Sequence, residues 1–171
     1  MKKILLITTV FFTQFSLFGD VETETHKNHN ESNLIQVALL LDTSGSMKGL
    51  IDQAKCQLWN VISDLEKANK SSQPISLQIA LYQFGIAKDA GGSEENGFLK
   101  KVVGFTDNLD HLSSKLFSLH AGNGGSEYYG EVIKSALDHL AWSTDPKVYK
   151  VAFVAGNETF HQGKVSFSEL T

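Results

Sequence analysis

The sequence of 171 residues predicts an α/β fold with a mostly parallel β-sheet, on three observations. A nearly continuous apolar run at residues 35–41 is typical of a central strand that is covered on both faces. Apolar residues at three- and four-residue spacing over 50–65 then predict an amphipathic helix. A second helix pattern at 126–142 precedes another apolar strand pattern at 148–155. With 42% apolar residues, the chain is long enough for one domain with a real core.

The beginning of the chain has the pattern of a secretory signal peptide, which we place at residues 1–19. Lys2 and Lys3 precede an uncharged, mostly apolar run that is short for a membrane span. An uncleaved membrane anchor is the alternative. Residues 20–33 are rich in charges and amides and are predicted to be a poorly ordered polar linker. We therefore expect export to the periplasm or the extracellular space, with no stable membrane span after cleavage.

The charge of the chain argues against nucleic acid as a partner. The formal net charge is −4, and loss of Lys2 and Lys3 with the leader makes it −6. The sequence contains no arginine, so the bidentate fork that recognises phosphates and guanines is missing. Cys56 is the single cysteine and cannot form an internal disulfide, so we expect core packing to hold the fold together.

The domain is expected over residues 34–171, and its next elements follow the first strand and helix. Clean alternation at 75–84, directly after a proline, predicts a second strand. Residues 98–105 predict a third strand that could form a hairpin-like antiparallel edge with the second. Thr106 or Asp107 is expected to cap the short helix that comes next.

The last predicted strand, at 148–155, is followed by a segment with loop character. No fifth or sixth strand follows in the sequence, so we expect a domain that is incomplete after its fourth strand. The apolar residues Val151, Phe153 and Val154 would then lie on an open sheet edge, which invites pairing with another chain. The alternative is that something else covers this edge.

The turn after the first strand carries the clearest chemical signal. Asp42, Ser44 and Ser46 follow a D-x-S-x-S spacing, and Gly45 allows a tight turn between the serines. Their oxygens are hard ligands, suited to Mg²⁺, Mn²⁺ or Ca²⁺. A helix cap would explain one hydroxyl but leave Asp42 without a role. A serine nucleophile is a third alternative, although the G-x-S-x-G elbow is absent.

These features resemble the von Willebrand factor type A (vWA) domain family, in a bacterial-type secreted member. The resemblance rests on "IQVALLLDTSGSM", the long helix after it, "GNGGSEYYGEVIKSAL" and "KVYKVAFVAGNETF", in that order over residues 34–165. It implies a Rossmann-like, doubly wound sheet with helices on both faces and strand order 3-2-1-4-5-6. In such sheets, ligands bind at the carboxyl ends of the strands where the winding reverses.

The resemblance also implies a metal-ion-dependent adhesion site, whose opening D-x-S-x-S is matched here. A threonine usually follows in the middle loop of the family. Ser126 is the closest hydroxyl in this chain, and Glu127 beside it is a substitute or an addition. The family's later aspartate falls on Gly156, next to which Asn157 offers an amide oxygen and Glu158 a carboxylate. The expected metal ligands are Asp42, Ser44, Ser46, Ser126, Glu127 and Asn157.

The function that the resemblance implies is an exported, metal-ion-dependent protein-binding or adhesion module, rather than an enzyme. A divalent cation, Mg²⁺ in the first place and Mn²⁺ or Ca²⁺ otherwise, would bridge to an acidic side chain of a protein partner. One alternative is a hydrolase, either metal-assisted at Asp42 and Glu127 or with Ser44 or Ser46 as nucleophile. Another is a truncated scaffold fragment that binds nothing.

Overall fold

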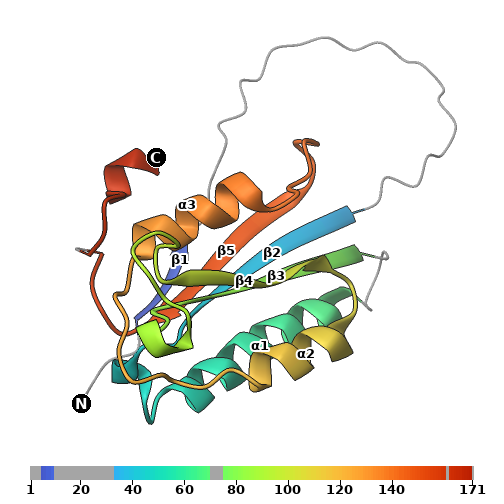
Figure 1. Cartoon of the computed structure of the whole chain (residues 1–171). Coiled ribbons are helices and arrows are strands. Elements are labelled where there is room, and N and C mark those ends of the chain that lie inside the picture. The colour runs from blue at the N-terminus through green and yellow to red at the C-terminus, as the bar shows by residue number, and fades with distance from the viewer. Residues whose placement is uncertain (1–4, 10–32, 70–74, 161, 171) are drawn as a thin grey trace, which may run out of the picture.

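The computed structural model describes residues 5–9, 33–69, 75–160 and 162–170. A five-stranded sheet in the order β1-β5-β2-β3-β4 forms its centre, with helices on both faces (Figure 1). The predicted polar linker lies outside the described residues except for Asn33, which opens the central strand.

The central strand is β2 (Asn33–Asp42), as the apolar run predicted. It pairs in parallel with β3 (Ile75–Phe84) on one side and with β5 (Tyr149–Gly156) on the other. The side chains of residues 37–41 are fully buried, because both faces of the strand are covered. At one edge, β4 (Leu99–Thr106) pairs antiparallel with β3, which confirms the predicted hairpin-like edge.

Helices cover the two faces of the sheet and separate the core into two clusters. Figure 1 shows α1 (Ile51–Asn69) and α2 (Leu109–Phe117) on one face and α3 (Tyr129–His139) on the other. Leu58 of α1 packs in one apolar cluster and Val132 of α3 in the second. This arrangement confirms the doubly wound α/β fold, and the order β4-β3-β2-β5 is the expected 3-2-1-4.

Two predicted helix boundaries were wrong. The helix predicted over 126–142 begins at Tyr129 rather than at Ser126, so the segment before it stays a loop. The cap of α2 is Asn108, not Thr106 or Asp107. The Asn108 side-chain oxygen accepts a peptide N–H three residues further on, at 2.9 Å, which satisfies one of the free donors of the first turn.

The edge of β5 is paired, whereas the sequence predicted it to be open. Strand β1 (Leu5–Thr9) runs antiparallel along it, with Leu5 opposite Gly156 and Thr9 opposite Ala152. An edge strand presents unpaired peptide groups that any extended segment can satisfy, and the apolar run of the predicted leader supplies one. The rest of that leader lies outside the described residues, and its export role stays a prediction. Among the residues that are described, no helix is long and apolar enough to span a bilayer.

Candidate functional site

The turn after β2 is tied to the end of the neighbouring strand. Thr43 donates its peptide N–H at 2.8 Å and its hydroxyl at 3.0 Å to the carbonyl oxygen of Phe84, the last residue of β3. A short 3-10 turn over Gly45–Met47 then leads toward α1. These bonds hold the D-T-S-G-S segment at the carboxyl end of the sheet, where the resemblance placed a ligand site.

Asp42 is fully buried at the end of its strand. Its Oδ1 accepts the peptide N–H of Ser44 at 2.8 Å, whereas its Oδ2 is buried without a hydrogen-bond partner. Burial, followed by the negative charge of Glu127, raises the pKa of Asp42 to about 7, although the Ser44 N–H opposes the rise. A carboxylate with one unpaired buried oxygen calls for a proton or a cation.

A hydroxyl network joins the three loops of the site. The first loop is the turn after β2, the middle loop is residues 118–128 between α2 and α3, and the last is the loop after β5. The hydroxyl oxygens of Ser44 and Ser46 lie 2.9 Å apart. The Ser46 hydroxyl also lies within donating distance of Glu127 Oε1, at 3.3 Å, and of Asn157 Oδ1, at 2.9 Å. Asn157 in turn donates its amide to the Ser46 carbonyl oxygen at 3.5 Å. Five of the six predicted ligands, those other than Ser126, are therefore brought together.

Glu127 supplies the second carboxylate of the site. Glu127 is only 6% exposed. Its Oε2, like Oδ2 of Asp42, is buried without a hydrogen-bond partner. Its peptide N–H donates to the side-chain oxygen of Gln162 at 3.1 Å. This bond ties the middle loop to the segment after β5. Burial raises the pKa of Glu127, and the nearby Glu158 charge adds to that effect.

The cluster has more acceptor oxygens than protons to satisfy them. Ser46 has one hydroxyl proton, which can serve Glu127 Oε1 or Asn157 Oδ1 but not both at once. Two carboxylate oxygens remain in addition. All of these atoms are hard oxygens, which suit Mg²⁺, Ca²⁺ or Mn²⁺. The donor set fits a divalent cation, although the described residues contain no cluster of three or more His, Cys, Asp or Glu side chains.

Two glycines let the loops approach this cluster closely. Gly85, just after β3, has φ +68°, and a Cβ there would stand 2.7 Å from Asp42 Oδ1. Gly125 has φ +117°, and its Cβ would stand 2.2 Å from the Gly85 carbonyl oxygen. A side chain at either position would therefore push the middle loop or the strand end away from Asp42.

Ser126 is the predicted ligand that lies apart from the network. It lines a neighbouring surface cavity with Lys88 and Asn123, and it interacts with the hydroxyl of Tyr128. Its neighbour Glu127 is the middle-loop residue that contacts Ser46. Glu158, the other carboxylate considered from the sequence, has an exposed side chain.

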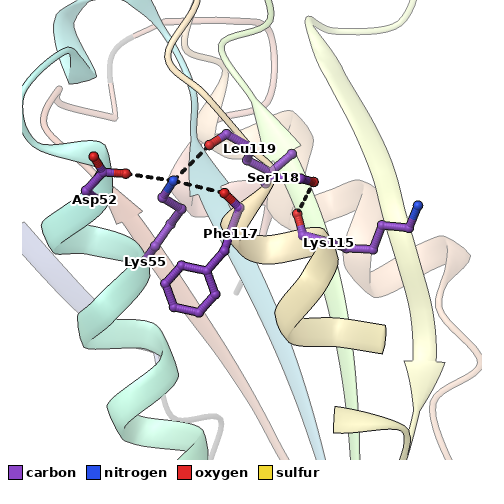
Figure 2. A network of polar contacts seen from close by, with 6 residues as sticks. All are labelled: Asp52, Lys55, Lys115, Phe117, Ser118 and Leu119. Atoms are coloured by element: carbon purple, nitrogen blue, oxygen red, sulfur yellow. Dashed lines mark hydrogen bonds and ion pairs between the residues drawn. The ribbon is translucent and has the colours of Figure 1, made fainter. Parts of the chain in front are cut away.

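Sequence reasoning missed Lys55, which holds the end of α2, where the middle loop begins. Figure 2 shows its ammonium between Asp52 of its own helix and the backbone at the end of α2. The Lys55 Nζ lies 2.7 Å from Asp52 Oδ1 and donates to the carbonyl oxygens of Leu119, at 2.9 Å, and Phe117, at 3.4 Å. This buried cation complements the carboxyl end of α2. The sequence did contain a signal for this buried lysine: Lys55 falls on the apolar stripe of α1, four residues after Ile51.

The middle loop is also tied to the first loop. The peptide N–H of Gly122 donates to the Thr43 carbonyl oxygen at 2.9 Å. Lys55 therefore holds the end of α2, and the Gly122–Thr43 bond ties the loop that follows to the turn after β2.

Two comparisons with known proteins bear on this chain. The sequence model of the von Willebrand factor type A domain matches residues 36–166. This range contains the D-T-S-G-S turn, the middle loop and the segment after β5. A search of the curated proteins gives no match.

Proposed function

This chain belongs to the von Willebrand factor type A domain family, and on that premise we propose that it is an exported, metal-ion-dependent binding module. Domains of this family generally serve protein interaction or adhesion and are typically not enzymes. For this chain we propose a divalent cation, with Mg²⁺ as the first candidate and Mn²⁺ or Ca²⁺ as alternatives. Asp42, Ser44, Ser46, Glu127 and Asn157 would hold it.

The observation that carries the proposal is the pair of buried carboxylate oxygens, Asp42 Oδ2 and Glu127 Oε2, that lack a hydrogen-bond partner. They lie beside hydroxyl and amide oxygens that have too few protons to satisfy them. A divalent cation would neutralise both carboxylates and accept the lone pairs of the neutral oxygens. Ser126 lines a neighbouring surface cavity and is not among the five proposed ligands.

We propose that the partner is a protein that presents an acidic side chain. The chain has a formal charge of −4, or −6 without its leader lysines, so an acidic group meets overall repulsion. A bound cation reverses the sign locally and can accept a carboxylate as a further ligand. Recognition would then depend on the metal and on the surface around it.

A hydrolase is the rival function, and the partners of the serines favour a ligand role instead. The Ser46 hydroxyl faces a carboxylate oxygen and an amide oxygen, and the Ser44 hydroxyl faces Ser46. A cluster of acceptors is suited to hold a cation. A serine nucleophile needs a base that is itself oriented by a third group.

Calorimetric titration of Mg²⁺, Mn²⁺ and Ca²⁺ into wild type and Asp42→Ala tests the proposal. We expect one divalent cation per chain in wild type and none in the variant. Generic esters are assayed in parallel. Metal-independent ester turnover that survives Asp42→Ala and is lost in Ser46→Ala would replace the binding module by a serine hydrolase. Partner capture in Mg²⁺ and in EDTA then tests whether recognition needs the cation.

A further inference from the structure

Gly156, at the end of β5, has no room for a side chain, and Tyr129 is the reason. A Cβ on Gly156 would stand 2.0 Å from the Tyr129 hydroxyl oxygen, 2.9 Å from the ring carbon Cζ and 3.1 Å from Cβ of Asp42. Real Cβ contacts essentially never fall below 3.0 Å. The phenol oxygen therefore fills the space into which a side chain at position 156 would project beside Asp42.

The phenol is held in this place by its own packing. Tyr129 is 3% exposed, and its ring makes edge contacts with Phe84, with centroids 4.8 Å apart, and tilted contacts with Phe160, at 5.0 Å. A buried ring between two aromatic neighbours cannot swing away without opening a void. Burial and the negative charge of Asp42 raise the pKa of Tyr129, so the phenol stays protonated and neutral.

The same oxygen holds the loop after β5. The Tyr129 hydroxyl oxygen accepts the peptide N–H of Glu158 at 3.2 Å. The residue between this bond and the end of β5 is Asn157, whose amide oxygen lies 2.9 Å from the Ser46 hydroxyl. The phenol thus fixes the turn that carries Asn157 into the site.

We infer that Tyr129 is a positioning residue of the proposed cation site, because its phenol oxygen excludes a side chain at Gly156 and anchors the loop that presents Asn157. The inference rests on the proposed function. The loop after β5 then offers the cation a neutral amide oxygen, and the second carboxylate comes from Glu127 in the middle loop. The two carboxylates of the site therefore belong to the first and middle loops.

Cation affinity tests the positioning role. Mg²⁺ and Mn²⁺ are titrated by calorimetry into wild type, Tyr129→Phe and the matched control Tyr128→Phe, whose hydroxyl bonds to Glu94 at the surface. Tyr129→Phe keeps the ring and is expected to weaken cation binding on the order of tenfold, as outer-shell changes do. Tyr128→Phe is expected to bind as wild type does. Equal affinities in wild type and Tyr129→Phe would overturn the inference but leave the proposed function standing.

No cation binding by wild type would instead overturn the proposed function, and the cation-site role of Tyr129 with it.

Measurements of folding stability in EDTA test, without a metal, whether the Tyr129 phenol excludes a side chain at Gly156. Gly156→Ala is measured by urea unfolding in wild type and in the Tyr129→Phe background. We expect it to lower the folding equilibrium constant roughly tenfold more in wild type, where the phenol oxygen is in the way. An equal loss in both backgrounds would overturn the steric part of the inference.

Discussion

The hydroxyl of Ser46 lies 2.9 Å from the amide oxygen of Asn157, although 111 residues separate them in the sequence. This bond closes the first loop of the site against the loop after β5. It also gives the Ser46 proton an acceptor and so leaves Glu127 Oε1 to compete for the same proton. The cluster, which holds two buried carboxylates, is therefore short of hydrogen-bond donors.

Replacement of Glu127 by Gln is expected to weaken Mg²⁺ binding at least roughly tenfold, because the cation loses one of two buried carboxylates. Glu158→Gln serves as the comparison, since Glu158 is exposed and is expected to change affinity by less than about threefold. Isothermal calorimetry measures both. The reverse order of effects would assign the second carboxylate to the loop after β5.

Replacement of Asp42 by Asn is expected to stabilise the metal-free protein while it removes cation binding. The amide keeps an oxygen for the Ser44 N–H and removes a buried charge that has an unpaired oxygen. At pH 8 in EDTA, the free energy of unfolding is expected to rise by on the order of 3 kcal/mol. Urea titration followed by circular dichroism measures it. An unchanged or lower stability for Asp42→Asn would contradict the expectation that the buried carboxylate destabilises the metal-free fold relative to an amide.

The stability of the metal-free protein is expected to fall as pH rises from about 4 to about 7. The pKa of Asp42 is about 7 in the folded protein, against 3.8 as the ordinary value. The folded state therefore binds more protons than the unfolded state over this window, so the free energy of unfolding decreases with pH and levels off above it. Urea titrations in EDTA give the profile. Asp42→Asn is expected to reduce the slope and to leave the part that comes from the raised pKa of Glu127, whereas an unchanged slope would show that Asp42 does not cause it.

Replacement of Lys55 by Met is expected to destabilise the fold by about 2–3 kcal/mol, because two backbone carbonyls lose a charged donor. The matched control is Lys67→Met. Lys67 forms an exposed ion pair with Asp64, and its loss is expected to cost less than about 0.5 kcal/mol. Thermal unfolding compares the two. Equal effects would show that Lys55 contributes no more than a surface charge.

Local patterns in the sequence were sufficient to predict most of the fold. The apolar run of β2 and the alternation of β3 each reflect burial, which a strand imposes on its own residues. The turn from Asp42 to Ser46 could be identified as a candidate cation site because its side-chain oxygens lie within one short segment. The core strands were confirmed, and the cation-binding role of the turn after β2 stays a prediction.

The remaining features depend on contacts between distant segments, which no local pattern encodes. The exclusion of a side chain at Gly156 comes from Tyr129 across the site. Glu127 could be named as a substitute, but its burial against Ser46 depends on how the middle loop folds. The pairing of β1 with β5 likewise depends on which segment reaches a free edge, so the predicted open edge was wrong.

We propose that Asp42 and Glu127 hold one divalent cation together with the hydroxyls of Ser44 and Ser46. Anomalous diffraction from crystals grown with Mn²⁺ tests it most directly, because it locates the ion itself. We expect a single strong peak within coordination distance of oxygens from both carboxylates. An absent peak at saturating Mn²⁺, or one that contacts neither Asp42 nor Glu127, would show that these two carboxylates do not form a cation site.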